Sequence, residues 1–180
     1  MRFESKVVLI TGGGGGIGKA TARRFLEEGA EGVVLGSRRQ EVLEAAKEEL
    51  DPSGERVELF AGDASRPETA KALVAAATER FGGVDVLVNS TGVFRLKPFE
   101  EETEADLEEA LDTTLRPTFY VSQVAVPEMR KRGGGAIVNV GSKWAIDAIA
   151  TTPTSAYSAA QAGRHALTKN LAVELSPRTT

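Results

Sequence analysis

The chain has 180 residues, of which 41% are hydrophobic and 27% are charged, and its formal net charge is −4. This length suits one domain with a sizeable core, so we expect residues 1–180 to form a single domain. The sequence contains no cysteine, which excludes disulfides, thiolate metal sites and cysteine nucleophiles. The acidic balance argues against a nucleic-acid partner. The apolar run at 7–10 is too short for a signal peptide or membrane span, so we expect a cytoplasmic protein without a membrane partner.

Five short apolar runs alternate with helical patterns along the chain. The runs are rich in β-branched residues and lie at 7–10, 33–35, 57–60, 84–88 and 136–140. Continuous runs of this kind are typical of parallel strands that are buried on both faces. The helical patterns cover roughly 17–28, 40–50, 70–81, 104–131 and 155–175, and Pro117 is expected to interrupt the fourth of them. The alternation predicts an α/β fold with a doubly wound parallel sheet, the Rossmann fold.

A glycine-rich segment, Thr11-Gly12-Gly13-Gly14-Gly15-Gly16-Ile17-Gly18, follows the first expected strand and opens a helix. Such a turn lets backbone amides approach a pyrophosphate, which lies at the helix N-terminus. We therefore expect a dinucleotide to be bound by Gly12, Gly14, Gly15, Gly16, Ile17 and Gly18. A tight turn without a ligand is the alternative.

The same segment also differs from the P-loop pattern at one residue. Read from Gly13, it gives the P-loop spacing, but Ala20 stands where a serine or threonine hydroxyl would hold Mg²⁺. No acidic residue at a strand end replaces that metal contact. The sequence therefore disfavours a nucleoside triphosphatase, and we expect no metal site.

Five ordered motifs resemble the short-chain dehydrogenase/reductase family. They are the glycine segment, Gly62-Asp63-Ala64, Asn89-Ser90-Thr91-Gly92, Asn139-Val140-Gly141-Ser142, and Tyr157-x-x-x-Gln161. The resemblance covers the whole chain and implies an oxidoreductase that acts on a carbonyl or alcohol with NAD(P). It also implies that the cofactor contacts Asp63, Ala64, Asn89 and Gly92.

Members of the family usually continue beyond this length with two further strands. The resemblance therefore implies a chain that lacks the last two strands of the family fold. The strand at 136–140 would then form an exposed sheet edge.

The residues after the second expected strand bear on the choice of cofactor. An acidic residue there would bind the ribose hydroxyls of NAD, but this chain has Ser37, Arg38 and Arg39. A hydroxyl and guanidinium groups suit the 2′-phosphate of NADP. We expect NADP(H) to be preferred, with NAD(H) as second choice and with Ser37 and Arg38 as the contacts. The alternative is that the arginines only begin a solvated helix.

The resemblance assigns four catalytic positions, two of which are altered. It gives Ser142 the role of the family's serine and Tyr157 that of the proton-transferring tyrosine. Gln161 stands at the position of the family's lysine, and Thr114 at that of its asparagine. A unit charge about 5 Å away is worth roughly 3 kcal/mol at an effective dielectric of about 20, and a neutral amide cannot supply it. We therefore expect an activity that is lower by at least about 100-fold.

Several alternatives stay open at this stage. The altered positions also fit a non-catalytic NADP(H)-binding or interaction protein, or a truncated gene product. Homo-oligomers through the helices at 104–131 and 155–175 are expected from the family. An apolar substrate pocket could be formed by Val93, Phe94, Trp144, Ile146 and Ile149, although packing against the helices explains them equally well. His165 is interpreted as structural.

Overall fold

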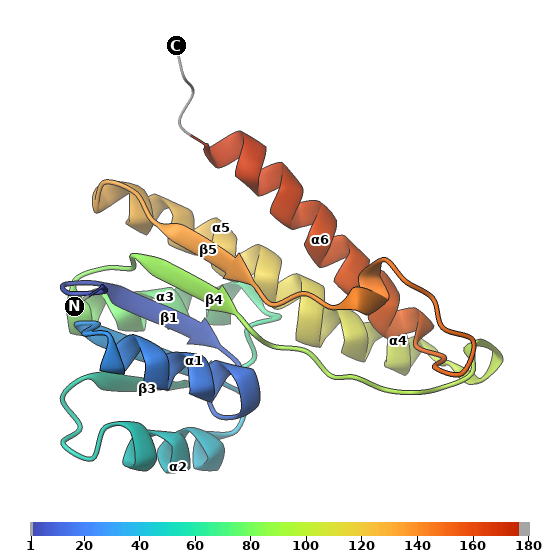
Figure 1. The fold of residues 1–180 in the computed structure, drawn as a ribbon, viewed down its shortest axis with the longest axis horizontal. Coiled ribbons are helices and arrows are strands. Elements are labelled where there is room, and N and C mark those ends of the chain that lie inside the picture. The colour runs from blue at the N-terminus through green and yellow to red at the C-terminus, as the bar shows by residue number, and fades with distance from the viewer. Residues whose placement is uncertain (1, 177–180) are drawn as a thin grey trace.

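The computed structural model describes residues 2–176 and contains a five-stranded parallel sheet with helices on both faces (Figure 1). The strands are β1 (Val7–Thr11), β2 (Gly32–Ser37), β3 (Val57–Ala61), β4 (Val86–Asn89) and β5 (Ala136–Asn139). The helices are α1 (Gly16–Glu27), α2 (Gln40–Leu50), α3 (Pro67–Phe81), α4 (Glu104–Ala110), α5 (Arg116–Lys131) and α6 (Ser155–Leu175). The order of strands in the sheet is β3-β2-β1-β4-β5. The predicted fold class is therefore confirmed.

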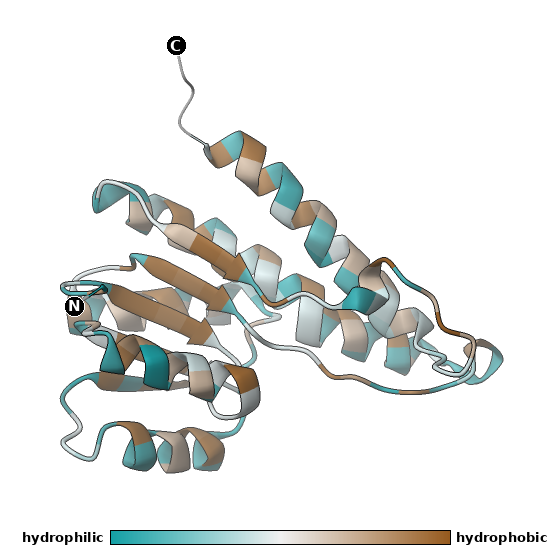
Figure 2. Ribbon diagram, in the orientation of Figure 1, coloured by the Kyte–Doolittle hydropathy of each residue, from teal (hydrophilic) through white to brown (hydrophobic). Residues whose placement is uncertain are grey.

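The central strand β1 separates two hydrophobic cores. Val7 and Leu9 point to the face that α3 and α5 cover, whereas Val8 and Ile10 point to the face that α1 and α2 cover. All four side chains have no exposed surface, and burial of one such side chain contributes roughly 1.5–3 kcal/mol to folding. Figure 2 shows β1 and β4 as hydrophobic along most of their length, and the apolar runs lack alternation because both faces of the sheet are covered.

The fourth helical pattern is divided in the structure. Helix α4 is followed by a π-helical segment, Leu111–Leu115, and then by α5, whose first turn contains Pro117. Proline has no N–H group to donate to the preceding turn, and a π turn moves the hydrogen bonding by one residue at that point. The expected interruption at Pro117 is thus confirmed, and it takes the form of the π segment. A second proline, Pro127, lies inside α5 and was not singled out from the sequence.

Strand β5 forms one edge of the sheet. It is less covered than the other strands, and Val138 is 50% exposed. Helix α6 packs with its first half on α4 and the π segment, while its second half extends away from the sheet (Figure 1). None of the helices in the described part of the chain has the length and apolar character needed to span a membrane.

Candidate active site

A cleft of about 650 Å³ lies at the carboxyl ends of the parallel strands. In doubly wound sheets this edge is where ligands bind. The cleft is bordered by the loop between β1 and α1, by the ends of β2 and β3, and by the segment after β4. Of the expected cofactor residues, it is lined by Gly12, Gly14, Gly15, Gly16, Ile17, Ser37, Arg38, Asp63, Ala64 and Gly92. Gly18 and Asn89 do not line it.

The glycine loop is shaped by close backbone contacts. Gly12 has a φ of +72°, and a Cβ there would lie 2.9 Å from the carbonyl oxygen of Ser90. A Cβ on Gly18 would lie 2.3 Å from the carbonyl oxygen of Gly12. Gly18 therefore allows α1 to start directly against the loop. By contrast, a Cβ at Gly15 or Gly16 would meet no atom within 4 Å, so their backbone is open to a ligand in the cleft.

The end of β2 presents two cations to the cleft. Arg38 and Arg39 are exposed, line the cleft, and form no ion pair with any residue in 2–176. The hydroxyl of Ser37 accepts a weak hydrogen bond of 3.5 Å from the N–H of Arg39. These groups are free to bind an anionic ligand.

Two of the expected cofactor residues also hold the local backbone. Asp63 accepts a hydrogen bond of 3.0 Å from the N–H of Ser65, which orders the turn between β3 and α3. Asn89 is fully buried, and its amide donates to Asn139 at 2.9 Å and to Ser122 at 3.3 Å. Asn89 thus joins the ends of β4 and β5 behind the cleft.

Three of the four expected catalytic residues lie around the start of α6 and the π segment. The amide nitrogen of Gln161 donates to the hydroxyl of Tyr157 at 3.1 Å. A Cβ at Gly92, which borders the cleft, would lie 3.8 Å from that nitrogen and 3.5 Å from Oγ1 of Thr114. Gly92 is therefore the point at which the cleft meets Thr114, Gln161 and Tyr157.

Several buried oxygens in this region have no hydrogen-bond partner within residues 2–176. They are Oγ1 of Thr91, Oγ1 of Thr114 and Oε1 of Gln161. Unsatisfied buried polar atoms are costly, and at a functional site they are explained by a bound molecule or water. These groups are two hydroxyls, which can donate or accept, and one amide oxygen, which accepts, and they suit a ribose or nicotinamide amide. The glycine cradle and these oxygens therefore fit a nicotinamide dinucleotide.

Ser142 stands apart from Tyr157. Its hydroxyl accepts from the N–H of Trp144 at 3.4 Å, at the start of a short 3-10 helix, Lys143–Ala145. In the described part of the chain it forms no hydrogen bond with Tyr157. The structure therefore brings Thr114, Gln161 and Tyr157 together and leaves Ser142 at the neighbouring strand end.

Aromatic side chains cover one side of Tyr157. The ring of Phe94 lies edge-on to Tyr157 with centroids 5.1 Å apart, and it is stacked on Trp144 at 6.1 Å. The ammonium of Lys143 lies 4.6 Å from the centre of the Trp144 ring. Trp144, Ile146 and Ile149 line a separate hollow of about 740 Å³ beside the first half of α6, whereas Val93 lines the cleft. Four of the five apolar residues expected to share a pocket are thus divided between two, and Phe94 lines neither.

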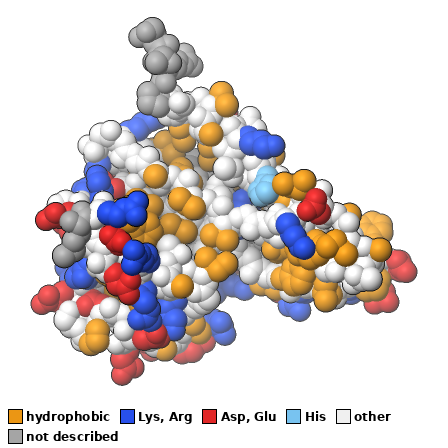
Figure 3. All heavy atoms as spheres, viewed as in Figure 1, with side chains coloured by type: hydrophobic (Ala, Val, Ile, Leu, Met, Phe, Trp, Pro, Cys, Tyr) orange, Lys and Arg blue, Asp and Glu red, His pale blue; other side chains and the backbone are white. Residues whose placement is uncertain are grey.

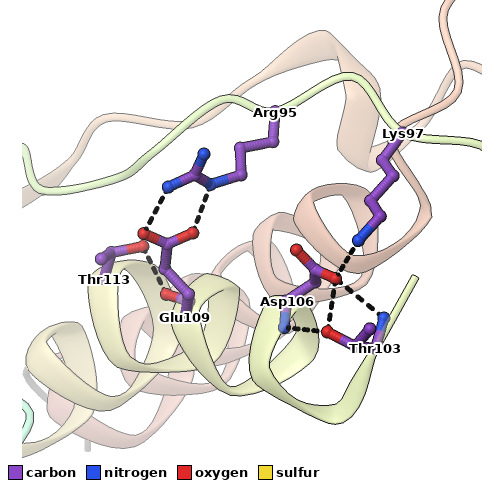
Figure 4. A network of polar contacts seen from close by, with 6 residues as sticks. All are labelled: Arg95, Lys97, Thr103, Asp106, Glu109 and Thr113. Atoms are coloured by element: carbon purple, nitrogen blue, oxygen red, sulfur yellow. Dashed lines mark hydrogen bonds and ion pairs between the residues drawn. The ribbon is translucent and has the colours of Figure 1, made fainter. Parts of the chain in front are cut away.

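The segment that carries Phe94 is fixed to α4 by ion pairs. Arg95 forms a bidentate pair with Glu109, and Lys97 lies 2.6 Å from Asp106, which also caps α4 with Thr103 (Figure 4). The hydrogen bond from Lys97 lowers the pKa of Asp106, and the hydrogen bond from Arg95 lowers that of Glu109. Both carboxylates are therefore ionised and hold the loop in place near Tyr157.

Two residues of this region were not singled out from the sequence. Glu102 accepts a hydrogen bond of 3.1 Å from the N–H of Ala156 and so caps the start of α6 beside Tyr157. Arg164, on the Tyr157 face of α6, is 1% exposed and donates four hydrogen bonds. The Arg164 position could have been noticed as a charge on the same helix face as Tyr157 and Gln161. His165 packs against Gly141, where a Cβ would lie 2.4 Å from Nε2.

No group of three or more His, Asp or Glu side chains that could hold a metal ion occurs within residues 2–176. The polar groups of the site are hydroxyls, amides and cations.

Comparison with known proteins agrees with this architecture. The model of the family described as short chain dehydrogenase matches residues 6–179. An uncharacterised oxidoreductase of Thermotoga maritima is 36% identical over 97% of this chain and 67% of its own length. Levodione reductase of Leifsonia aquatica is 39% identical over 96% of this chain and 65% of its own length.

A solved structure shows the same arrangement in space. The crystal structure of an NAD⁺-bound xylitol dehydrogenase superimposes with a TM-score of 0.91 at 29% identity, over 98% of this chain and 67% of that one. The chain thus spans about two thirds of the length of these proteins. On the match to the family model and these relatives, the chain belongs to the short-chain dehydrogenase/reductase family of oxidoreductases.

Proposed function

We propose that this chain binds NADP(H) in the cleft and acts as a carbonyl or alcohol oxidoreductase of reduced activity. The observation that carries the proposal is the continuity of the site. One cleft runs from the two unpaired arginines at the end of β2, past the open backbone of Gly15 and Gly16, to Gly92 beside the Gln161–Tyr157 hydrogen bond. Its two ends offer an anion site and a proton donor.

The preference for NADP(H) rests on charge. A 2′-phosphate would gain charge-assisted hydrogen bonds from Arg38 and from the hydroxyl of Ser37. No carboxylate of a described residue forms an ion pair with Arg38 that such a phosphate would have to break. NAD(H) would lack this contact and would bind more weakly.

The chemistry follows from the positions of the polar groups. When bound, the nicotinamide supplies or accepts the hydride. Tyr157 donates the proton to the carbonyl oxygen, and Gln161 holds the tyrosine hydroxyl through its amide nitrogen at 3.1 Å. Thr91, Thr114 and Gln161 provide the oxygens that position a ribose or a water next to it. Ser142 would bind the same substrate oxygen from the end of β5.

The proposed reduction in activity also follows from the polar groups around Tyr157. Gln161 contributes no positive charge beside the tyrosine hydroxyl, so negative charge that develops there during proton transfer is less stabilised. The hydroxyl of Ser142 accepts a hydrogen bond from its own 3-10 turn and, among the described residues, forms none with Tyr157. These two observations favour a second candidate, a non-catalytic NADP(H)-binding protein, over any unrelated function.

Binding and turnover separate the two candidates. We expect calorimetry to show NADPH binding with at least about 10-fold preference over NADH. Absence of binding to either would contradict both candidates. In turnover assays with NADPH and a panel of ketones, Q161K is expected to raise the rate by at least about 100-fold over the parent chain.

The exposed Gln123 on α5 offers a matched control. Q123K adds the same charge away from the cleft and is expected to leave the rate unchanged. If Q161K binds NADPH but remains as slow as the parent with every ketone, the second candidate is favoured.

The proposed function also includes self-association of the chain. We propose one domain that self-associates through α4, α5 and the exposed part of α6, where Phe119 and Val173 are 45% and 81% exposed. Sedimentation of the full chain would test this, and a monomer at every concentration would contradict it.

A further inference from the structure

Arg164 is a buried cation whose hydrogen-bond partners are all uncharged. Its Nη2 donates to the carbonyl oxygens of Thr91 and Thr114 at 2.7 and 2.8 Å. Its Nη1 donates to the carbonyl oxygen of Val140 at 2.7 Å, and its Nε donates to the hydroxyl of Thr118 at 2.9 Å. No carboxylate among residues 2–176 forms an ion pair with it. Buried charges are normally paired with an opposite charge, so this one calls for an explanation.

The four bonds join the elements that surround the site. Thr91 follows β4 and precedes Gly92 at the inner end of the cleft. Thr114 belongs to the π segment, and Val140 follows β5 two residues before Ser142. Arg164 therefore ties both strand ends and the π segment to α6, the helix that carries Tyr157.

Arg164 and the tyrosine share one face of α6. Arg164 lies seven residues, or two turns, after Tyr157. Thr114, whose carbonyl oxygen accepts from Arg164, lies beside Gly92 together with the Gln161 amide nitrogen, which donates to the tyrosine hydroxyl. Burial lowers the pKa of Arg164 to about 10, and the charge of an ionised Tyr157 is the interaction that raises it.

The other charged groups around Tyr157 are already paired or engaged. On the side of α4 and the loop after β4, a small cavity beside Tyr157 is lined by Arg95, Lys97, Glu102, Asp106 and Glu109. Arg95 pairs with Glu109 and Lys97 with Asp106, while Glu102 caps α6. Elsewhere, Asp112 pairs with Arg116, Lys143 lies over Trp144, and His165 packs against Gly141. Arg164 is thus the described cation near Tyr157 that has neither a carboxylate nor an aromatic ring as partner.

We propose that Arg164 is a positioning residue of this site, which fixes the ends of β4 and β5 against α6 and stabilises negative charge on the oxygen of Tyr157. This role rests on the proposed function in one respect: negative charge on Tyr157 has a catalytic use only if the chain is an oxidoreductase. Electrostatic attraction between two groups acts on both of them, and at low effective dielectric it extends over several ångströms. Arg164 would partly replace the charge that Gln161 does not provide.

The test uses the small number of tyrosines in the chain. There are two, Tyr120 and Tyr157, so Y120F leaves Tyr157 as the sole tyrosine. In this background the near-ultraviolet absorbance of ionised tyrosine is recorded against pH for the parent, R164M and R164K. We expect R164M to ionise at a pH about one unit higher than the parent. R164K is expected to shift in the same direction, because a lysine buried among uncharged partners loses its proton at lower pH than an arginine does. Equal midpoints for R164M and the parent would overturn the proposal.

Two controls keep the test informative. R132M removes a guanidinium that pairs with Asp85 at the other end of the sheet, and it should leave the midpoint unchanged. If R164M does not fold, R164K is compared with the parent in its place, and equal midpoints overturn the proposal. The titration needs no cofactor and no turnover, so its failure is separate from a failure of NADPH binding.

Discussion

The N-terminal half of the molecule, residues 2–81, and its C-terminal half, residues 82–176, form the two sides of one cleft by different means. In the N-terminal half the cleft is shaped by backbone, because Gly12 and Gly18 allow strand, loop and helix to touch. In the C-terminal half it is shaped by long-range side-chain bonds, of which those of Arg164 span 24 to 73 residues.

The difference also appears in the sheet and on the surface. The strands β1 and β2 are almost completely buried, whereas β5 is partly exposed. Figure 3 shows hydrophobic side chains gathered at the end of the molecule where the loops of the C-terminal half lie, and Phe99 and Ile146 are 74% and 78% exposed. A buried side that is shaped by backbone contacts thus faces a more exposed side that depends on a few polar contacts.

The largest effect is expected from a side chain at Gly18. G18A places a methyl group where a Cβ lies 2.3 Å from the carbonyl oxygen of Gly12. We expect it to lower the free energy of unfolding by about 3 kcal/mol, measured by urea denaturation. G15A is the matched control, since its Cβ would meet no atom within 4 Å. Equal stability of the two variants would show that the loop is not shaped by this contact.

The next largest effect is expected at the opposite end of the sheet. Asp85 is 4% exposed and bound by Arg132, by Lys6 and by the N–H of Val7. Burial alone would raise the pKa of Asp85, but these hydrogen bonds and charges lower the pKa below its usual value of 3.8. Since the folded-state pKa lies below the unfolded one, Asp85 contributes stability above about pH 4, and this is lost as the pH falls through the folded-state pKa.

We therefore expect D85N to cost about 2 kcal/mol at neutral pH and to weaken the loss of stability on acidification. Urea denaturation from neutral to acid pH would measure both. D147N, on an exposed loop, should behave as the parent does. An unchanged pH dependence in D85N would show that other carboxylates cause the acid instability.

A smaller effect is expected from the charge at the end of β2. R38A should reduce the preference for NADPH over NADH by about 10-fold, measured by calorimetry with both nucleotides. R24A is a suitable control, because Arg24 is exposed on α1 and pairs with Glu28. If R38A and R24A change the preference equally, the discrimination arises from overall charge.

The smallest effect is expected from the loop that carries Phe94. E109Q removes the pair with Arg95 at a partly exposed site, which is worth less than about 1 kcal/mol. We expect a thermal midpoint within about 3 °C of the parent but a raised KM for ketone substrates, because the loop next to Tyr157 loses an anchor. E104Q on the same helix, at an exposed position, should change neither.

The contrast between the halves explains what could be predicted from sequence. The strands, the glycine loop and the helix boundary at Pro117 depend on local composition, and the structure confirmed them. The bonds of Arg164 and the cap that Glu102 places on α6 join residues distant in sequence, and no periodic pattern marks such pairs. For the same reason the division of the apolar residues between two hollows was not predicted.

The π segment at Leu111–Leu115 has a consequence for how the helix that contains it can change. A π turn holds one residue more than an α turn, so the segment takes up one extra residue without rotating α5 relative to α4. Deletion of one residue there should leave a continuous α-helix in which Thr118 still faces Arg164 and α4 still pairs with Arg95 and Lys97. Insertion of a further residue would instead rotate one side by about 100° relative to the other. The segment should therefore tolerate the loss of one residue better than the gain of one.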